Sequence, residues 1–384
     1  MCIRDRRSEY DKMDVLRKEN GEEWRKRATS QGSKYSKYQL RERWTKREIR
    51  PRSKGPSRIP GGIVMKAVFF NGSTAELIDA RKPRPRQGEA LIRVDMAGIC
   101  ATDLMILQGY MDFNGILGHE FVGTVVSSEK TALNGKRVTG EIFVPCRKCD
   151  ACRSGNEKHC PKRTVIGIDG RDGAFAEFLA LPNGNLHLIP DGMSDEEAVF
   201  IELIAAACDM PARVQFERKS RVVVLGDGRL SAMAAQVVSL ESDDVLVLGL
   251  DTKKLEAFES IGIKTGEVTR KAELLGTFDI AVDCTGKPNG LPLAAELVHP
   301  QGPIILKSTY NSPLGWNPAP IVINELTLIG SRCGPFETAI ELIENGKVKV
   351  KPFLTAVYEL EDWENALRRA RRSDSFKVAL RPSS

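Results

Sequence analysis

The chain has 384 residues, 41% of them hydrophobic and 28% charged, which is typical of a globular protein long enough for two domains. No apolar run approaches the roughly 20 residues that cross a bilayer, so we do not expect a membrane protein. Nine cysteines without a secretory signal indicate a reducing compartment, taken to be the cytoplasm, and favour metal binding or catalysis over disulfides.

The net charge of +6 comes entirely from the first 64 residues. This head holds 19 basic and 9 acidic residues, whereas the other 320 residues hold 38 and 42. It is polar, lacks hydrophobic periodicity and ends in a Pro/Gly/Ser/Arg run, so we expect residues 1–64 to be disordered. Because MKAVFF opens a strand cleanly, we expect Met65 to be the native start. The alternative is a basic arm that binds RNA or a partner; otherwise no nucleic-acid partner is expected.

The most specific stretch is PCRKCDACRSGNEKHCP, which has the cysteine spacing C-x2-C-x2-C-x7-C. Soft thiolates at this density suit a tetrahedral zinc ion. Disulfides are a poor alternative, since an i, i+3 pair bridges badly. Four thiolates leave no open coordination position, so we expect a structural zinc. Its ligands would be Cys146, Cys149, Cys152 and Cys160.

Upstream of these cysteines, two short segments carry a second set of metal-ligand side chains. Alternating strand patterns cover residues 65–70 and 89–95, and GICATD and GHEFVG follow them. The four residues of interest are Cys100, Asp103, His119 and Glu120. A thiolate, an imidazole and a carboxylate are the ligands of a catalytic zinc that keeps one position open. Each residue alone could belong to the core, but the second zinc module favours a metal site.

A further carboxylate lies in an apolar helical run. The S-x-x-E pattern at residues 194–197 is a capping box and predicts a helix through AVFIELIAAAC. Glu202 lies inside this run, and a buried carboxylate is costly unless it is paired or bound to metal. We therefore expect Glu202 to face a metal or substrate, the alternative being a helix face turned toward water.

From Arg221 onward the pattern changes to buried strands that alternate with helices. VVVLGDGRLSAMAAQVV reads as strand, glycine turn and helix, and DDVLVLGL as the next strand. Further strand-like runs cover 278–286, 303–309 and 326–331, with helices at 253–260 and 289–298. We expect six alternating strands in a dinucleotide-binding domain. Residues 335–384 then predict two helices and a final strand.

Four pieces together resemble the medium-chain zinc-dependent alcohol dehydrogenase superfamily: GICATD, GHEFVGTVV, the four-cysteine stretch and VLGDGRLS. Glu202 makes the chain most similar to the glucose, sorbitol and threonine dehydrogenase-like branch. The resemblance implies an α/β fold in which a Rossmann-type doubly wound parallel sheet is inserted in a mostly-β GroES-like catalytic domain. The expected divisions are residues 65–210 for the catalytic domain, 211–333 for the Rossmann domain and 334–384 for a C-terminal segment that returns to the catalytic domain.

The resemblance also implies roles for individual residues. Cys100 and His119 would ligate the catalytic zinc, with Glu120 or Glu202 completing the shell. Asp103 would orient the imidazole, and Thr102 would pass on the substrate proton. The expected cofactor contacts are Gly226, Gly228, Ser231, Asp251, Thr285, Ser308, Cys333 and Lys377. Met105 stands where many members have a relay histidine, so proton exit must use another route.

The activity implied is reversible oxidation of an alcohol or polyol to a carbonyl, with hydride transfer to NAD or NADP and two zinc ions per chain. NAD is favoured because no arginine follows the second strand of the nucleotide-binding region. A homo-oligomer, dimer or tetramer, is expected by analogy. The alternatives are a zinc-free quinone or enoyl reductase on the same fold, and a non-enzymatic protein that uses the basic head to bind RNA or a partner.

Overall fold

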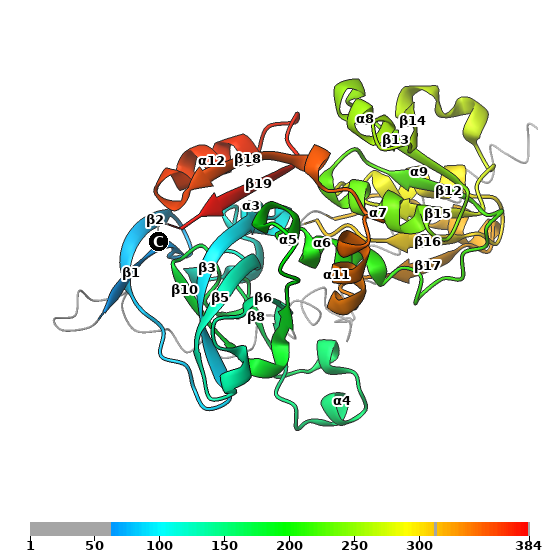
Figure 1. The fold of residues 1–384 in the computed structure, drawn as a ribbon. Helices are drawn as coiled ribbons and strands as arrows, with labels where there is room; N and C mark the ends of the chain where they lie inside the picture. Colours follow the sequence, from blue (N-terminus) through cyan, green and yellow to red (C-terminus); the bar gives the residue numbers. More distant parts are fainter. Residues whose placement is uncertain (1–62, 311–312, 383–384) are drawn as a thin grey trace, which may run out of the picture. The chain divides into compact units, whose positions relative to one another are not determined.

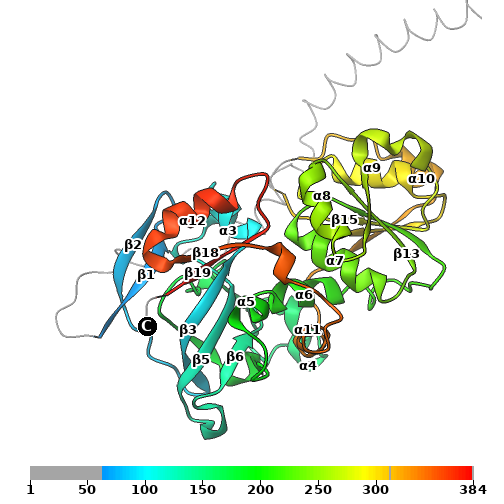
Figure 2. The same ribbon diagram turned by 45° about the horizontal axis from the view of Figure 1, so that its top comes forward.

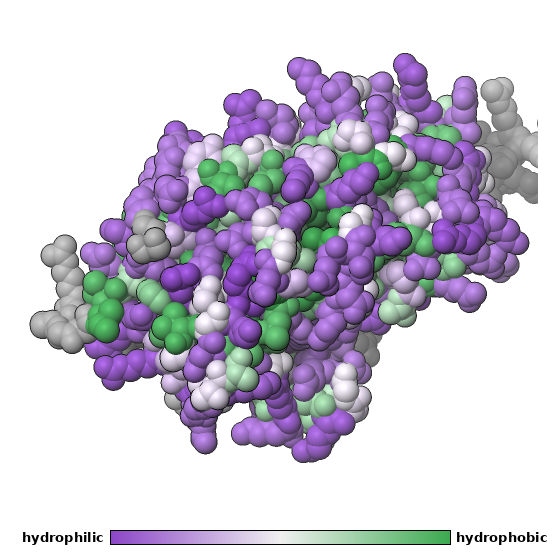
Figure 3. Space-filling view, in the orientation of Figure 1, coloured by the Kyte–Doolittle hydropathy of each residue, from purple (hydrophilic) through white to green (hydrophobic). Residues whose placement is uncertain are grey.

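The computed structural model describes residues 63–310 and 313–382 (Figure 1). The expected disorder of the basic head concerns residues 1–64, of which 1–62 lie outside these ranges. Of the last two, Val64 already belongs to the first strand, which begins one residue before Met65. Within them, no helix is both long and apolar enough to cross a bilayer. The face drawn in Figure 3 is mostly hydrophilic, with smaller hydrophobic patches between the polar residues.

Strands of the first half of the described chain, joined by β18 and β19 from its end, pair mainly in antiparallel fashion. Their largest sheet has seven strands in the order β11-β6-β5-β3-β19-β18, with β10 paired to β3. Smaller three-stranded sheets are β2-β1-β4 and β7-β8-β9. The strands are β1 (Val64–Phe70), β2 (Ala75–Arg81), β3 (Glu89–Ile99), β4 (Gly115–Ile116), β5 (Glu120–Ser128), β6 (Arg137–Gly140), β7 (Phe143–Val144), β8 (Thr164–Ile166), β9 (Gly170–Arg171), β10 (Phe178–Pro182), β11 (Leu186–Leu188), β18 (Leu354–Glu359) and β19 (Lys377–Arg381).

A six-stranded parallel sheet follows in the order β14-β13-β12-β15-β16-β17. Numbered from β12, this is the 3-2-1-4-5-6 order of a doubly wound nucleotide-binding sheet. Figure 2 shows its strands among the helices that accompany them. The strands are β12 (Arg221–Leu225), β13 (Asp244–Gly249), β14 (Lys264–Glu267), β15 (Ile280–Asp283), β16 (Pro303–Leu306) and β17 (Thr327–Gly330). The fold class expected from the sequence is thus confirmed.

Alternate side chains of β12 explain why this sheet is covered on both faces. Val222 and Val224 pack in one apolar core with α7 (Arg229–Ser239) and α8 (Thr252–Glu259). Val223 and Leu225 pack in another core with α9 (Gly290–Leu297). A parallel strand buried on both faces must be apolar throughout, as VVVL is. The remaining helices are α3 (Ala101–Ile106), α4 (Asp150–Arg153), α5 (Asp195–Ala198), α6 (Ile201–Cys208), α10 (Ala319–Ile323), α11 (Phe336–Glu344) and α12 (Trp363–Ala370).

Three local features differ from the sequence expectation. The single helix expected after the capping box is two helices, because α5 ends at Ala198 and α6 begins at Ile201. The Ser194–Glu197 box itself is present. Strands β14 and β18 were not identified among the strand-like runs. β14 reads KTGE and is an edge strand, so it needs no continuous apolar pattern.

The end of the chain returns to the first large sheet. β19 pairs in antiparallel fashion with β3, where Val378 lies opposite Ile99, and in parallel fashion with β18. This pairing brings Lys377, at the start of β19, close to the end of β3 that carries the metal-ligand side chains.

Candidate active site

Antiparallel pairing of β3 and β5 assembles the first cluster of metal-ligand residues. Gly98 of β3 lies opposite Glu120 of β5, so Cys100, just past the end of β3, meets His119, just before β5. One donor atom each from Cys100, His119 and Glu120 lie within 4.8 Å of one another. Residues 19 and 20 positions apart thus form one cluster of a half-buried thiol, a buried imidazole and a buried carboxylate, which is the donor set of a catalytic zinc.

Asp103 holds the two segments of this cluster together. Its side chain is fully buried and accepts the backbone N–H groups of Cys100 (2.7 Å) and Gly118 (3.3 Å). The same carboxylate lies 3.3 Å from Nδ1 of His119. Burial opposes protonation of this imidazole, but Asp103 and Cys100 outweigh it and hold the pKa of His119 well above its usual value. Nδ1 of His119 has no hydrogen-bond partner among the described residues, so the orienting role of Asp103 stays a prediction that rests on this short distance.

One carboxylate oxygen of Glu120 accepts a hydrogen bond and the other has no hydrogen-bond partner among the described residues. Its Oε2 accepts a hydrogen bond from Nζ of Lys377, and both side chains are 0% exposed. Burial alone would raise the pKa of Glu120, but Lys377 outweighs it and lowers the pKa. Oε1 is buried and has no hydrogen-bond partner among the described residues. An unpartnered carboxylate oxygen beside a thiol and an imidazole fits a zinc ligand.

Gly98 provides the space for this carboxylate. A Cβ built on Gly98 would lie 2.4 Å from Oε2 of Glu120 and 3.2 Å from a methyl of Val199. We expect Gly98→Ala to displace Glu120, weaken zinc binding and lower kcat by about tenfold or more, a barrier increase of ~1.4 kcal/mol. Zinc content and turnover measure the effect, with Gly192→Ala as control because its Cβ would meet nothing within 4 Å. Full zinc occupancy in Gly98→Ala would contradict this role of Gly98.

Glu202 lies beside the cluster, close enough for its charge to interact with those of Glu120 and His119. It is buried on α6, and its Oε1 accepts a hydrogen bond from Sγ of Cys333 at 3.5 Å. Burial and the neighbouring charge of Glu120 raise the pKa of Glu202. No donor atom of Glu202 belongs to the group that lies within 4.8 Å. Of the two carboxylates that the sequence left open, Glu120 therefore has the position of a direct ligand.

The four-cysteine stretch forms a second metal-ligand cluster. The sulfur atoms of Cys146, Cys149, Cys152 and Cys160 all lie within 4.8 Å of one another. Sγ of Cys149 lies 3.4 Å from that of Cys152 and 3.7 Å from that of Cys160. The backbone N–H of Lys148 is the main cause that lowers the pKa of Cys146 to about 6, which favours the thiolate. All eight cysteines that the structure describes are free thiols, and this cluster has the donor set of a structural zinc site.

Asp209 ties the four-cysteine stretch to the nucleotide-binding sheet, a role that sequence reasoning missed. Its carboxylate accepts hydrogen bonds from Lys158 (2.9 Å), Arg213 (3.2 Å), Ser331 (2.9 Å) and the backbone N–H of Arg332 (3.2 Å). Burial would raise the pKa of Asp209, but its hydrogen-bond donors, of which Lys158 has the largest effect, lower this pKa to about 2. No local pattern around Asp209 announces these partners, since two of them lie more than 120 residues away.

The glycine turn after β12 fits a dinucleotide pyrophosphate. Gly226 has φ +111°, and a Cβ there would lie 2.9 Å from Oγ of Ser231 and 3.0 Å from the carbonyl of Cys284. A Cβ on Gly228 would meet nothing within 4 Å, which leaves open space before the first turn of α7. Oγ of Ser231 is buried without a partner in the described chain. Such a turn at a helix N-terminus is the usual cradle for phosphate.

The other expected cofactor residues fall into two groups. Thr285 and Ser308 lie just beyond the carboxyl ends of β15 and β16, where Asp283 accepts the hydroxyl of Thr285 (2.7 Å) and Ser308 accepts the N–H of Gly286 (2.7 Å). Three others are held by protein groups. Cys333 contacts Glu202, Lys377 pairs with Glu120, and Asp251 caps α8 by accepting N–H groups of Lys253 and Lys254.

Arg229 is a further candidate that the sequence reasoning did not single out. It directly follows Gly228 as the first residue of α7, and its Nη1 donates to the carbonyl of Phe376 (3.4 Å). Its Nη2 is buried and finds no partner in the part of the chain described here. The GDGR sequence, with a cation directly after the second glycine, was the available signal.

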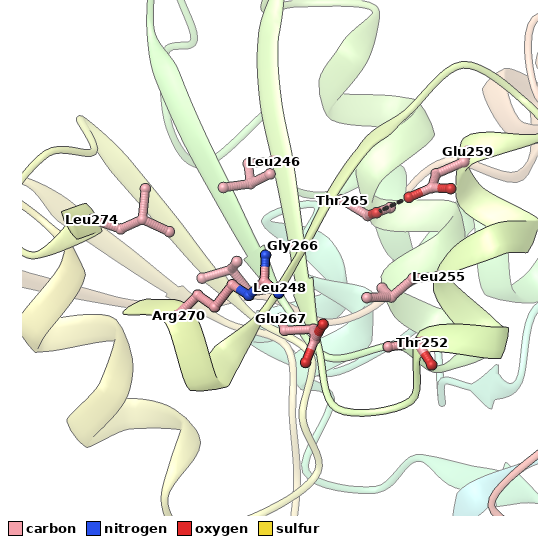
Figure 4. Close-up of a pocket in the computed structure, with 10 residues that line it drawn as sticks. All are labelled: Leu246, Leu248, Thr252, Leu255, Glu259, Thr265, Gly266, Glu267, Arg270 and Leu274. Atoms are coloured by element: carbon pink, nitrogen blue, oxygen red, sulfur yellow. Dashed lines mark hydrogen bonds between the residues drawn. The ribbon is translucent and has the colours of Figure 1, made fainter. Parts of the chain in front are cut away.

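A separate hollow lies along the outer part of the nucleotide-binding sheet (Figure 4). Leucines of β13 and α8 line it together with residues of β14 and the segment after it, and Thr265 donates a hydrogen bond to Glu259 across its rim. The lining residues are Leu246, Leu248, Thr252, Leu255, Glu259, Thr265, Gly266, Glu267, Arg270 and Leu274. None of the expected zinc ligands lines this hollow.

Comparison with known proteins agrees with this geometry. Residues 86–191 match the alcohol dehydrogenase GroES-like domain family. A sorbitol dehydrogenase of Halalkalibacterium halodurans is 29% identical, over 83% of this chain and 99% of that protein. An L-threonine 3-dehydrogenase of Streptomyces avermitilis is 30% identical, over 79% and 95%. The structure of an alcohol dehydrogenase from Escherichia coli CFT073 with NADH superimposes with a TM-score of 0.77 at 25% identity, over 83% of this chain and all of that one. The chain belongs to the medium-chain zinc-dependent alcohol dehydrogenase superfamily.

Proposed function

We propose that Cys100, His119 and Glu120 hold the catalytic zinc of this alcohol dehydrogenase and that its substrate is a polyol or amino alcohol. The reaction class, NAD(P)-dependent oxidation of an alcohol to a carbonyl, follows from the family, whose relatives here are sorbitol, arabinitol and threonine dehydrogenases. The observation that carries the assignment is the unpartnered Oε1 of Glu120 beside the thiol and the imidazole.

Each residue of the cluster has a separate task in the proposed site. A bound zinc ion supplies positive charge that stabilises the deprotonated alcohol and lowers its pKa. Asp103 keeps the His119 imidazole in position, and Lys377 fixes Glu120 so that one oxygen stays free. Oγ1 of Thr102 lies 3.8 Å from Sγ of Cys100, next to the ligands, where it can take the substrate proton. Glu202, on α6, lies beside this proposed zinc site.

The cofactor is proposed to lie at the carboxyl ends of the parallel strands, with its pyrophosphate on the Gly226–Gly228 turn and with Arg229, the next residue, as a cation beside it. The proposed division is a catalytic part in residues 65–210 and 334–384 and a nucleotide-binding part in residues 211–333. The exposed Val322, Ile323 and Leu328 near the outer strand β17 support the expected homo-oligomer, which light scattering tests.

A screen of the purified protein tests the function. Sorbitol, arabinitol, threonine and simple alcohols are each offered with NAD and with NADP, and the zinc content is measured on the same sample. We expect two zinc ions per chain and cofactor reduction that is fastest with a polyol or an amino alcohol. One zinc per chain, with reduction of quinones or enoyl substrates and no alcohol oxidation, would instead support the zinc-free reductase.

A further inference from the structure

The glycine turn carries an acid that reaches the neighbouring strand. Asp227 lies between the two glycines of the turn, and its Oδ2 accepts the backbone N–H groups of Leu250 (2.7 Å) and Asp251 (3.0 Å). These two residues directly follow the end of β13 at Gly249. The carboxylate of Asp227 is therefore held at the carboxyl end of the second strand of the nucleotide-binding sheet, although it belongs to the turn after the first.

Gly249 leaves the room that Asp227 fills. A Cβ on Gly249 would lie 2.8 Å from Cβ of Asp227 and 3.1 Å from its Oδ2. In dinucleotide-binding folds, an acid near the end of this strand hydrogen-bonds the adenosine ribose. Here any side chain on the last strand residue would collide with Asp227. Asp227 and a side chain at position 249 thus exclude one another.

Of the two residues that directly follow the strand, one is apolar and the other carries a carboxylate that caps a helix. The side chain of Leu250 is 80% exposed and apolar. The carboxylate of Asp251 accepts backbone N–H groups of Lys253 and Lys254 and so serves as the N-cap of α8. An N-cap carboxylate is directed at its own helix, because it satisfies the free N–H groups of the first turn. Both of these bonds go to Oδ1 of Asp251, so Asp251 and Asp227 are two acids at this strand end. Asp227, by contrast with the helix cap, is held by the N–H groups that directly follow the strand.

We propose that Asp227 takes the place of the strand-end acid, binds the adenosine ribose hydroxyls and makes the enzyme prefer NAD(H) to NADP(H). This inference rests on the proposed function as an NAD(P)-dependent dehydrogenase. A 2′-phosphate in place of the 2′-hydroxyl would bring a second negative charge against a fixed carboxylate. Like charges at contact distance in a partly buried site repel strongly.

The charge on Asp227 is maintained by its surroundings. Burial works against ionisation, but the N–H groups of Leu250 and Asp251 lower its pKa below the usual value. Nζ of Lys254 lies 3.2 Å from Oδ1 and 5.1 Å from the centroid of the Phe376 ring. The Lys254 side chain is only 10% exposed, so this cation positions the carboxylate rather than facing a phosphate. Lys253 is exposed, two residues after Asp251, and is a cation that could meet a 2′-phosphate.

The test measures binding rather than turnover. The holoenzyme is titrated with NADH and with NADPH, and the fluorescence of the reduced nicotinamide gives both Kd values. We expect the wild-type protein to bind NADH at least about tenfold more tightly than NADPH, or ~1.4 kcal/mol. Asp227→Asn keeps an oxygen for the two backbone N–H groups but loses the charge, so the Kd ratio should fall toward one.

Two further variants separate ribose binding from a structural role. Asp251→Asn removes the neighbouring carboxylate that the sequence favoured, and should lower thermal stability while the Kd ratio stays unchanged. Asp227→Gly combined with Gly249→Asp moves the acid to the strand end, because it removes both the carboxylate and the Cβ that a side chain at position 249 would meet. One methyl of Leu255 would lie 2.8 Å from the new Cβ and must rotate away. Recovery of NADH preference in the double variant would show that the position of the charge matters and not the turn itself.

The outcomes against the inference are distinct. If the wild-type protein prefers NADPH, the inference is overturned. Lys253→Ala would then test whether Lys253 causes that preference. An unchanged ratio in Asp227→Asn, or a changed ratio in Asp251→Asn, also overturns it. If Asp227→Asn unfolds, the wild-type ratio and the double variant still decide. Failure of the wild-type protein to bind either dinucleotide would instead contradict the proposed function on which the inference rests.

Discussion

Cys100→Ala should abolish alcohol oxidation and remove one of the two zinc ions per chain, while NADH binding persists. The thiol is the soft ligand of the cluster with His119 and Glu120, and the remaining imidazole and carboxylate form a poor zinc site. Loss of the ion removes several kcal/mol of stabilisation of the developing alkoxide. We therefore expect kcat to fall by about 10³-fold or more, since each ~1.4 kcal/mol is a factor of ten.

The measurements are turnover, zinc content and the Kd for NADH on the same preparation. Cys208→Ala is the matched control, because burial raises the pKa of this thiol to about 11 and it belongs to neither cysteine cluster. The control should keep both zinc ions and full activity. If Cys100→Ala retained wild-type turnover, the zinc mechanism proposed for this site would be wrong.

Lys377→Met should destabilise the protein by about 3–5 kcal/mol, because it leaves the Glu120 carboxylate buried without its partner. Methionine has a similar length but no charge. Adding Glu120→Gln removes the orphaned charge, so the double variant should regain much of the lost free energy of unfolding. Chemical denaturation of the wild-type protein, the two single variants and the double variant gives the coupling energy.

The same variant also tests the alternative role of Lys377 at the cofactor. The family resemblance implied a cation against the pyrophosphate, yet this side chain is 0% exposed and engaged with Glu120. If Lys377→Met kept wild-type stability but bound NADH much more weakly, the resemblance would be right and the pairing with Glu120 unimportant. Arg229→Ala, at the glycine turn, should weaken NADH binding without such a loss of stability.

Features that depend on spacing along the chain were predictable from the sequence. The four cysteines lie within fifteen residues, so their clustering follows from a short loop. The glycine turn and the capping box at Ser194 are likewise local, because their geometry is set by a few consecutive residues. The apolar run VVVL predicted a strand buried on both faces. The polar edge strand β14 was not predicted, because an edge strand need not have an apolar sequence.

The partners of side chains across the fold were decided only by the tertiary structure. Lys377 meets Glu120 across 257 residues because β19 joins β3. The choice between Glu120 and Glu202 depends on which carboxylate the strand pairing brings to Cys100 and His119. Asp227 reaches the end of β13 because the parallel strands place that end beside the glycine turn. The sequence by itself determined which chemical groups are present and the fold they imply, whereas packing determined which of those groups meet, since contact depends on strand register and burial rather than on distance along the chain.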